Sequence, residues 1–324
     1  MRKYIITVLV FLASISTEAQ EVNQSHNIVI GISNDVIKLE KNLSYYYFNS
    51  TNKYLGWYEG YTNTLTVINL ESRDVIDIPV NKGRGPFEFS LIRGFTIIDD
   101  KAYILDLQNL KIVKFDLDQN VYLSEKLLGR NRITHLTTNG EILLGRGLSR
   151  NAIYFEIDKN DLEISAINNS INETIADDFL KNPYKSDGPF IANKEYILSL
   201  RRYESSMYFY KESVLVDEYF DDMITNTDYK VDGFGFAQLP EETSYKLLDA
   251  ALDNKNNLLI LAKGATKNFK YGNHIVSVLN LNSEKFARSI ELNELQSPRR
   301  LVLNDDNLFV YDEEKYVIKI FNYE

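Results

Sequence analysis

The chain has 324 residues, of which 44% are hydrophobic, 12% aromatic and 25% charged, and its net charge is −10. These fractions are ordinary for a globular protein and exclude a disordered or collagen-like chain, while the acidic balance argues against nucleic acid and anionic membrane surfaces as partners. Cysteine is absent, which excludes disulfides, thiol catalysis and cysteine-bound zinc.

The first predicted element is a targeting segment. Arg2 and Lys3 precede an apolar run over residues 4–13, and small residues up to Ala19 follow. The run is shorter than the roughly 20 residues that cross a bilayer, and this order is typical of a secretory signal peptide. We expect residues 1–19 to be removed, leaving an exported protein, periplasmic or secreted, without stable membrane insertion. An uncleaved anchor is the alternative.

A repeat of four short strands follows. Runs that alternate apolar with polar residues predict strands, and groups of four recur about every 40 to 60 residues, the period of a propeller blade. We therefore expect residues 20–324 to form an all-β, six-bladed β-propeller. The predicted blades span about 43–80, 91–128, 132–167, 187–220, 245–292 and 298–324. The last unit has only three strands, and a strand within residues 27–40 is expected to complete it and close the ring.

An acidic residue ends the predicted second strand of three units: Glu59, Asp106 and Asp312. A carboxylate at such a corner accepts backbone N–H bonds and fixes the shape of the turn, so we expect a structural role for these side chains. The third and fourth units have Arg146 and Arg201 at about the corresponding place.

Residues 83–89 read Gly-Arg-Gly-Pro-Phe-Glu-Phe, and two predicted strands follow within residues 91–115. This stretch resembles an NHL repeat. It is also similar to the six-bladed β-propeller proteins exported by Bacteroidetes, many of which carry Gly-x-Gly-Pro-Gly-Glu-Phe after their first blade. The present chain has Phe87 in place of the third glycine. The resemblance implies a fold and an exported location, but no activity, because propellers host binders, lyases, lactonases and scaffolds alike.

The long connections of the predicted blades all fall on one face. They lie at 81–90, 168–187, 221–244 and 264–274, and they join the second strand to the third or one blade to the next. Insertions gathered on one face are typical of the binding face of a repeat protein, although tolerated loop drift is the alternative.

Ten of the twelve arginines that follow residue 19 lie in or beside the loops of that face. Arginine holds carboxylates and phosphates through a planar, two-pronged set of donors, so these residues predict an anionic ligand such as an acidic sugar or a peptide carboxylate. Ion pairing with acids on the same face is the alternative. The ligand-binding candidates, which include two loop phenylalanines able to stack on sugars, are Arg84, Arg93, Arg132, Arg146, Arg201, Arg202, Phe234, Phe236, Arg299 and Arg300.

Catalytic signals are sparse. The chain has no hydrolase nucleophile elbow, zinc-protease motif or phosphate-binding loop. His135, on a predicted first strand, and His274, at the end of the 264–274 loop, are the candidates for a catalytic base, with a structural histidine as the alternative. No metal or other cofactor is expected. A calcium ion stays an open alternative that no calcium-loop motif supports.

These observations favour an exported, non-catalytic binding module that holds a glycan, a peptide or an envelope protein on its long-loop face. The rival hypothesis is a hydrolase or lyase acting at the mouth of the propeller channel, with His135 or His274 as base, Arg93 or Arg300 as anchor, and calcium assistance. A scaffold subunit of an envelope complex is a third interpretation. Residue patterns alone do not decide between them.

Overall fold

The structure is a computed structural model. It describes residues 31–32, 36–39, 48–59, 63–129, 131–148, 152–167, 188–202, 206–211, 214–219, 230–231, 237–238, 245–265, 270–271 and 274–323. The expected signal segment, Phe234 and Phe236 lie outside these residues. The chain divides into two compact units, one made of Met1–Asn81 with Glu294–Glu324 and the other of Lys82–Asn293. Strands are the regular elements of the described residues, and none of these residues belongs to a helix that could cross a membrane.

The first unit contains two antiparallel sheets. One has its strands in chain order: β3 (Phe48–Ser50), β4 (Tyr54–Glu59), β5 (Thr64–Asn69) and β6 (Val75–Pro79). The other combines both ends of the chain: β26 (Pro298–Leu303), β27 (Asn307–Asp312), β28 (Val317–Asn322), β2 (Val36–Lys38) and β1 (Gly31–Ile32). β2 pairs antiparallel with β28, placing Ile37 opposite Ile318. The expected amino-terminal strand therefore completes the last sheet.

The second unit contains four further antiparallel sheets, again with strands in chain order. The first two are β7 (Ile92–Ile98), β8 (Lys101–Asp106), β9 (Lys111–Asp116) and β10 (Val121–Leu127), then β11 (Arg132–Thr138), β12 (Leu143–Leu148), β13 (Tyr154–Ile157) and β14 (Ile164–Ala166). The next two are β15 (Phe190–Ala192), β16 (Ile197–Leu200), β17 (Ser206–Lys211) and β18 (Val214–Tyr219), then β21 (Tyr245–Leu252), β22 (Asn257–Ala265), β24 (Ile275–Asn280) and β25 (Lys285–Glu291). β23 (Lys270–Tyr271) extends β22, and β19 (Lys230–Val231) pairs with β20 (Ala237–Gln238).

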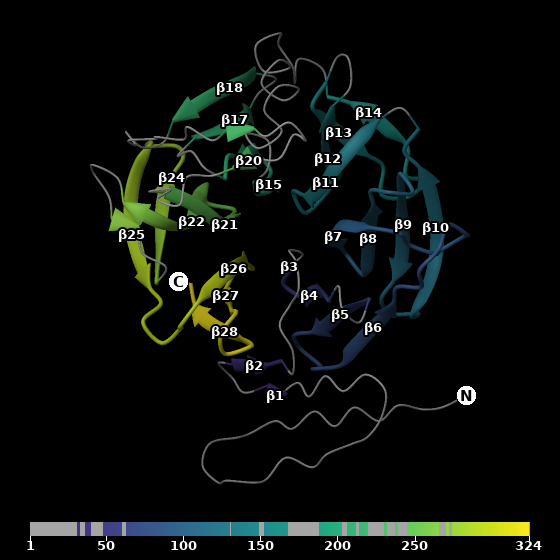
Figure 1. Cartoon of the computed structure of the whole chain (residues 1–324), viewed down its shortest axis with the longest axis horizontal. Helices are drawn as coiled ribbons and strands as arrows, with labels where there is room; N and C mark the ends of the chain where they lie inside the picture. The colour runs from purple at the N-terminus through teal and green to yellow at the C-terminus, as the bar shows by residue number, and fades with distance from the viewer. Residues whose placement is uncertain are drawn as a thin grey trace. The chain divides into compact units, whose positions relative to one another are not determined.

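Within this second unit the first strand of each sheet faces inward. β7, β11, β15 and β21 lie side by side in chain order, whereas β10, β14, β18 and β25 form the outer side (Figure 1). Side chains at the starts of the inner strands therefore come from different sheets yet lie near one another.

Neighbouring sheets share apolar cores, because alternating residues of each strand face the next sheet. Tyr103 and Ile112 of one sheet pack with Ile133 and Leu143 of the next. In the first unit, the buried Trp57 shares a core with Ile37 and Phe309. Six antiparallel sheets, each containing four strands in this order, are the blades of a propeller. The predicted all-β, six-bladed β-propeller fold is thus confirmed.

Candidate functional site

The Asp106 carboxylate, at the end of β8, holds two chain segments together. Its oxygens accept hydrogen bonds from the backbone amides of Ser90 and Leu91, which precede β7, and from those of Gln108 and Asn109 in the following turn, at 2.8–3.1 Å. Asp106 has no exposed surface. The four amides would otherwise lack these acceptors. The carboxylate therefore fixes the start of β7 relative to the end of β8.

Asp312 makes the same four kinds of contact in the last sheet. It accepts hydrogen bonds from the amides of Gln296 and Ser297 before β26, and from those of Glu314 and Lys315 after β27. The structural role expected for the acidic corners is therefore confirmed at Asp106 and Asp312.

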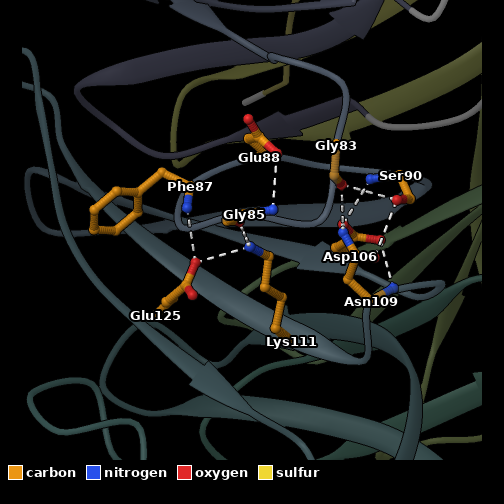
Figure 2. Close-up of polar contacts among 9 residues, drawn as sticks. All are labelled: Gly83, Gly85, Phe87, Glu88, Ser90, Asp106, Asn109, Lys111 and Glu125. Atoms are coloured by element: carbon orange, nitrogen blue, oxygen red, sulfur yellow. Dashed lines mark hydrogen bonds and ion pairs between the residues drawn. The ribbon is translucent and has the colours of Figure 1, made fainter.

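The glycine motif forms a loop that rests on this corner. The Gly83 carbonyl accepts hydrogen bonds from Ser90 Oγ at 3.0 Å and Asn109 Nδ2 at 2.9 Å (Figure 2). Glu88 Oε2 accepts the amide of Gly85 at 2.7 Å, so the motif glutamate closes its own loop. The motif is thus a structural device that positions the start of β7.

Two residues outside the motif hold the same loop. Lys111 donates to the Gly85 carbonyl at 3.1 Å and to Glu125 at 2.8 Å, and Glu125 also accepts the amide of Phe87 at 2.9 Å (Figure 2). Although burial opposes the change, hydrogen bonds from Lys111 and Phe87 and the lysine charge lower the pKa of Glu125. A lysine at the start of β9 and a glutamate near the end of β10 were the available sequence signal, because these two ends of an antiparallel pair lie at the same end of the sheet.

Four of the sheets have a bulge near the start of their first strand, where one extra residue is inserted opposite the second strand. The extra residue is Arg93 in β7, Thr134 in β11, Leu248 in β21 and Arg299 in β26. In β11 the bulge places His135 directly opposite Arg146 on β12, and Ile133 opposite Gly147.

This register corrects the expected alignment of the third unit. In the second unit, Asp106 pairs with Ile92, the residue just before the bulge of β7. In the third unit, the residue just before the bulge of β11 is Ile133, and it pairs with Gly147. Gly147 is therefore the counterpart of Asp106. Arg146 therefore stands one position before the place that sequence spacing gave it. The spacing could not show this, since a bulge depends on pairing between strands.

Arg146 is buried, with 1% of its surface exposed. Its Nη2 donates to the Gly188 carbonyl at 3.1 Å, and its guanidinium carbon lies 5.4 Å from the centre of the Phe190 ring. Gly188 leaves no room for a side chain, because a Cβ there would lie 2.0 Å from the Leu200 carbonyl oxygen. Arg146 of one sheet is thereby fixed against the backbone of the next.

His135 is the point on which the arginines converge. Its Nδ1 lies 2.9 Å from Thr134 Oγ1. Burial is the largest cause that holds the pKa of His135 well below its ordinary range, and the positive charges of Arg146, Arg93 and Arg202 lower this pKa further. We call Arg93, Arg146 and Arg202, together with His135, the arginine cluster. Three sheets contribute to it.

Arg202 ties the arginine cluster to a fourth sheet. Its Nη1 donates to the carbonyls of Leu247 and Leu248 on β21, at 3.2 and 3.4 Å. Arg93, His135 and Arg202 are each partly exposed. The buried Arg146 adds a weakly screened positive charge opposite His135.

The other predicted site residues of the second unit are not among the charges that lower the pKa of His135. Arg201 is 1% exposed and packs with its guanidinium carbon 4.4 Å from the centre of the Tyr208 ring. Arg84 and Arg132 are exposed, and His274 is partly buried in the β21–β25 sheet. In the first unit, Arg299 forms an ion pair with Glu313, the alternative considered for the arginines, and Arg300 is partly buried.

The described residues contain no group of three or more histidine, aspartate or glutamate side chains arranged to hold a metal ion. The residues that converge in the second unit are cationic, and they suit an anion rather than a cation.

Comparison with known proteins gives the fold and no family. No family model and no curated protein matches the chain. Among solved structures, the chain is similar to BF0058 of Bacteroides fragilis NCTC 9343, for which export is proposed, with a TM-score of 0.53, 13% identity and coverage of 88% of this chain and 91% of that one.

Two further structures are similar over most of their length. A catalytically inactive variant of virginiamycin B lyase from Staphylococcus aureus, solved with quinupristin, has a TM-score of 0.52 and 12% identity over 89% of this chain and 99% of that one. The β-propeller domain of Cps50 (Swd1) from Myceliophteria thermophila has a TM-score of 0.51 and 10% identity over 89% and 100%. At such identities the likeness establishes the β-propeller fold alone.

Proposed function

We propose that this protein is an exported binding module that holds an anionic ligand, carried by a glycan, a peptide or a protein partner, at the arginine cluster. The observation that supports this function is the convergence of three guanidinium groups from three sheets on the partly exposed His135. Guanidinium groups bind carboxylates with two parallel hydrogen bonds. A propeller presents such groups without reordering the chain, which lowers the entropic cost of binding.

Export follows from the charged and apolar order of residues 1–19, and BF0058 is a fold neighbour for which export is also proposed. We extend the proposal to membership among NHL-like propellers exported by Bacteroidetes, on the strength of residues 83–89. Amino-terminal sequencing of the protein recovered from the periplasm or medium tests export. The expected first residue is Gln20, and an intact Met1 in the cytoplasm would contradict it.

Binding is tested by calorimetry with two probes, an oligogalacturonate and a peptide that carries a free carboxylate. Arg93→Ala with Arg202→Ala should weaken binding about 10- to 100-fold, the range that corresponds to losing charge-assisted hydrogen bonds. Arg288→Ala is the matched control, since Arg288 is an exposed arginine on β25 in the same unit. Equal weakening by both changes would point to general electrostatics, and unchanged affinity in the double variant would refute the site.

A lyase or hydrolase at the same cluster is the second candidate. The observation that favours it is the position of His135 opposite Arg146, because an imidazole there could take a proton from a substrate held by the guanidinium group. The guanidinium groups beside it would stabilise negative charge that develops in the substrate. Under this function His135→Ala abolishes turnover of a bound anionic probe and leaves folding intact. Under the binding function the variant keeps most of its affinity, and no product forms with the wild-type protein, with or without calcium.

A further inference from the structure

The hydroxyl of Thr134 touches the imidazole of His135, although the two residues are neighbours in one strand. Successive side chains of a regular strand point to opposite faces of the sheet. Thr134 is the bulge residue of β11, and the bulge interrupts this alternation. Its Oγ1 lies 2.9 Å from His135 Nδ1. The bulge therefore joins a hydroxyl to the ring at the place where Arg146 stands on the opposite strand.

The same hydroxyl has a second partner. Thr134 Oγ1 donates to the carbonyl oxygen of Arg146 at 3.2 Å, and a carbonyl oxygen can only accept. A hydroxyl has one proton, so the proton given to this carbonyl is not available to the ring. His135 Nδ1 must then be the donor of the 2.9 Å hydrogen bond. In the reverse arrangement, two oxygen atoms would face each other at 3.2 Å with no proton between them.

This pattern decides which nitrogen of His135 carries the proton. Burial and the charges of Arg146, Arg93 and Arg202 hold the pKa of His135 well below its ordinary range. The ring is therefore neutral at neutral pH, with one N–H group and one lone pair. Because the N–H group is at Nδ1, the lone pair is at Nε2, on the side of the ring that is turned away from Thr134.

Nε2 is an acceptor that the fold does not use. Within the part of the chain that the structure describes, the imidazole makes one hydrogen bond, to Thr134. Nε2 is not among the side-chain atoms that are fully buried without a partner, and His135 is partly exposed. The guanidinium groups can only donate, whereas Nε2 can only accept. A ligand that satisfies both must combine a negative charge with a hydrogen-bond donor.

We infer that the ligand of the arginine cluster carries a hydroxyl or an amide N–H on one of the two carbon atoms nearest its carboxylate, and that His135 Nε2 accepts this donor. The donor must lie close to the carboxylate, because His135 stands directly opposite Arg146 and side chains paired across two strands are about 5 Å apart. This inference rests on the proposed function and narrows its ligand class. It makes His135 a specificity-determining residue that distinguishes such acids from plain carboxylates.

The position of the proton is measured first, on the wild-type protein without ligand. In protein labelled with ¹⁵N, long-range proton–nitrogen NMR spectra of the ring separate a protonated nitrogen from one with a lone pair. We expect the His135 proton on Nδ1. Thr134→Val, which keeps the shape and removes the hydroxyl, should move part of the population to Nε2. Thr138→Val is the matched control, since the Thr138 hydroxyl of the same strand bonds to the Ile142 carbonyl and should not affect the ring.

Three probes with the same three-carbon acid skeleton measure the preference. Glycerate has hydroxyl donors, N-acetylalanine has an amide N–H and propionate has neither. Titrations followed by the backbone amide signals of Ile133 and Leu136, which flank the site on β11, should show that one of the first two binds at least about threefold more tightly than propionate. Tighter binding of glycerate points to a sugar acid or hydroxy acid as the source, and tighter binding of N-acetylalanine points to a peptide carboxyl terminus.

His135→Phe keeps a flat ring and removes the acceptor, so it should weaken binding of the preferred probe about 3- to 10-fold and leave propionate unchanged. This loss is smaller than the one expected for Arg93→Ala with Arg202→Ala, which should weaken all three probes. Circular dichroism checks that each variant folds. The proton position and the probe preference of the wild-type protein test the inference without any variant.

The outcomes separate this inference from the proposed function. A proton on Nε2, equal binding of the three probes, or a preference that persists in His135→Phe would overturn the inference. The proposed function would stand in these cases as long as the arginine change weakens binding. If no acid binds the wild-type protein, or if the arginine change leaves binding unaltered, the proposed function fails and the inference fails with it.

Discussion

The Phe87 ring stacks on the Tyr122 ring, with centroids 5.2 Å apart and planes 13° from parallel, while the Phe87 backbone has a φ of 54°. Many of the exported propellers that this stretch resembles have glycine at this place, and a left-handed φ favours glycine, since glycine adopts it without cost. In the present chain the Phe87 backbone is strained, and the Phe87 ring makes a contact that joins the glycine motif to β10.

This balance predicts an unusual order of stability at position 87. Phe87→Ala loses the stacking contact and keeps the strain, so its free energy of unfolding should fall by about 1–2 kcal/mol. Phe87→Gly loses the contact and relieves the strain, so it should be about 1 kcal/mol more stable than the alanine variant. Urea denaturation of both variants measures the difference. An alanine variant at least as stable as the glycine variant would contradict the left-handed backbone.

Asp106→Ala should destabilise the second unit strongly. The change removes the shared acceptor of four backbone amides at a fully buried position, and a loss of about 3–5 kcal/mol is expected. Asp118→Ala is the control, since Asp118 is exposed in the turn between β9 and β10, and it should shift stability by less than about 1 kcal/mol. Similar urea midpoints for the two variants would rule out the corner role.

Leu110→Asn should leave the protein at least as stable as wild type and raise its free energy of unfolding by about 0.5–1 kcal/mol. Asparagine tolerates the left-handed region better than leucine does, and Asn63 occupies the equivalent turn of the first sheet with a φ of 51°. The change is measured as a shift of the urea midpoint at constant slope. Added stability would show that the left-handed backbone at this turn costs the leucine energy. A clear loss of stability would instead assign Leu110 to packing.

Two buried tyrosines predict a loss of stability at high pH. Burial raises the pKa of Tyr103 and that of Tyr154 to about 12 from 10.0. Each contribution is fully present below about pH 10 and is lost as the pH rises toward 12, because the unfolded phenol gives up its proton first. Each two-unit shift corresponds to about 2–3 kcal/mol. Urea denaturation between pH 8 and 11.5 measures the decline, and Tyr103→Phe should make it shallower. A flat profile would exclude the shift.

Arg146 should contribute to the low pKa of His135, next to the larger effect of burial. Arg146→Met removes a positive charge opposite the imidazole, so the pKa of His135 should rise toward its ordinary value, whereas Arg146→Lys should keep it low. Proton NMR of the His135 ring, assigned with His135→Gln, follows the titration. The low pKa also means that the wild-type protein loses stability as the pH falls below about 6.5, because the unfolded histidine takes up a proton that the folded one does not. An unchanged pKa in Arg146→Met would place the guanidinium away from the ring.

Residue patterns along the chain predict the blade repeat, the acidic corners and the completion of the last sheet by the amino-terminal strand. The first two features depend on short-range patterns, namely alternation within a strand and a carboxylate close to the amides it accepts. The third follows from a count, because the last unit has three strands and a spare strand lies near the amino terminus. Asp106 and Asp312 could be recognised because each acts on the turn that follows it, within three residues.

Which of the twelve arginines after residue 19 come together is visible only in the folded chain. Arg93, Arg146 and Arg202 lie on different sheets, and only the packing of inner strands and the bulge in β11 bring them to His135. Residue patterns also did not predict the left-handed backbone of Phe87 or the exposure of three leucines, Leu91, Leu110 and Leu127. Burial, register at a bulge and contact between sheets arise from pairing over long separations in the chain, and residue patterns along one strand do not encode such pairing.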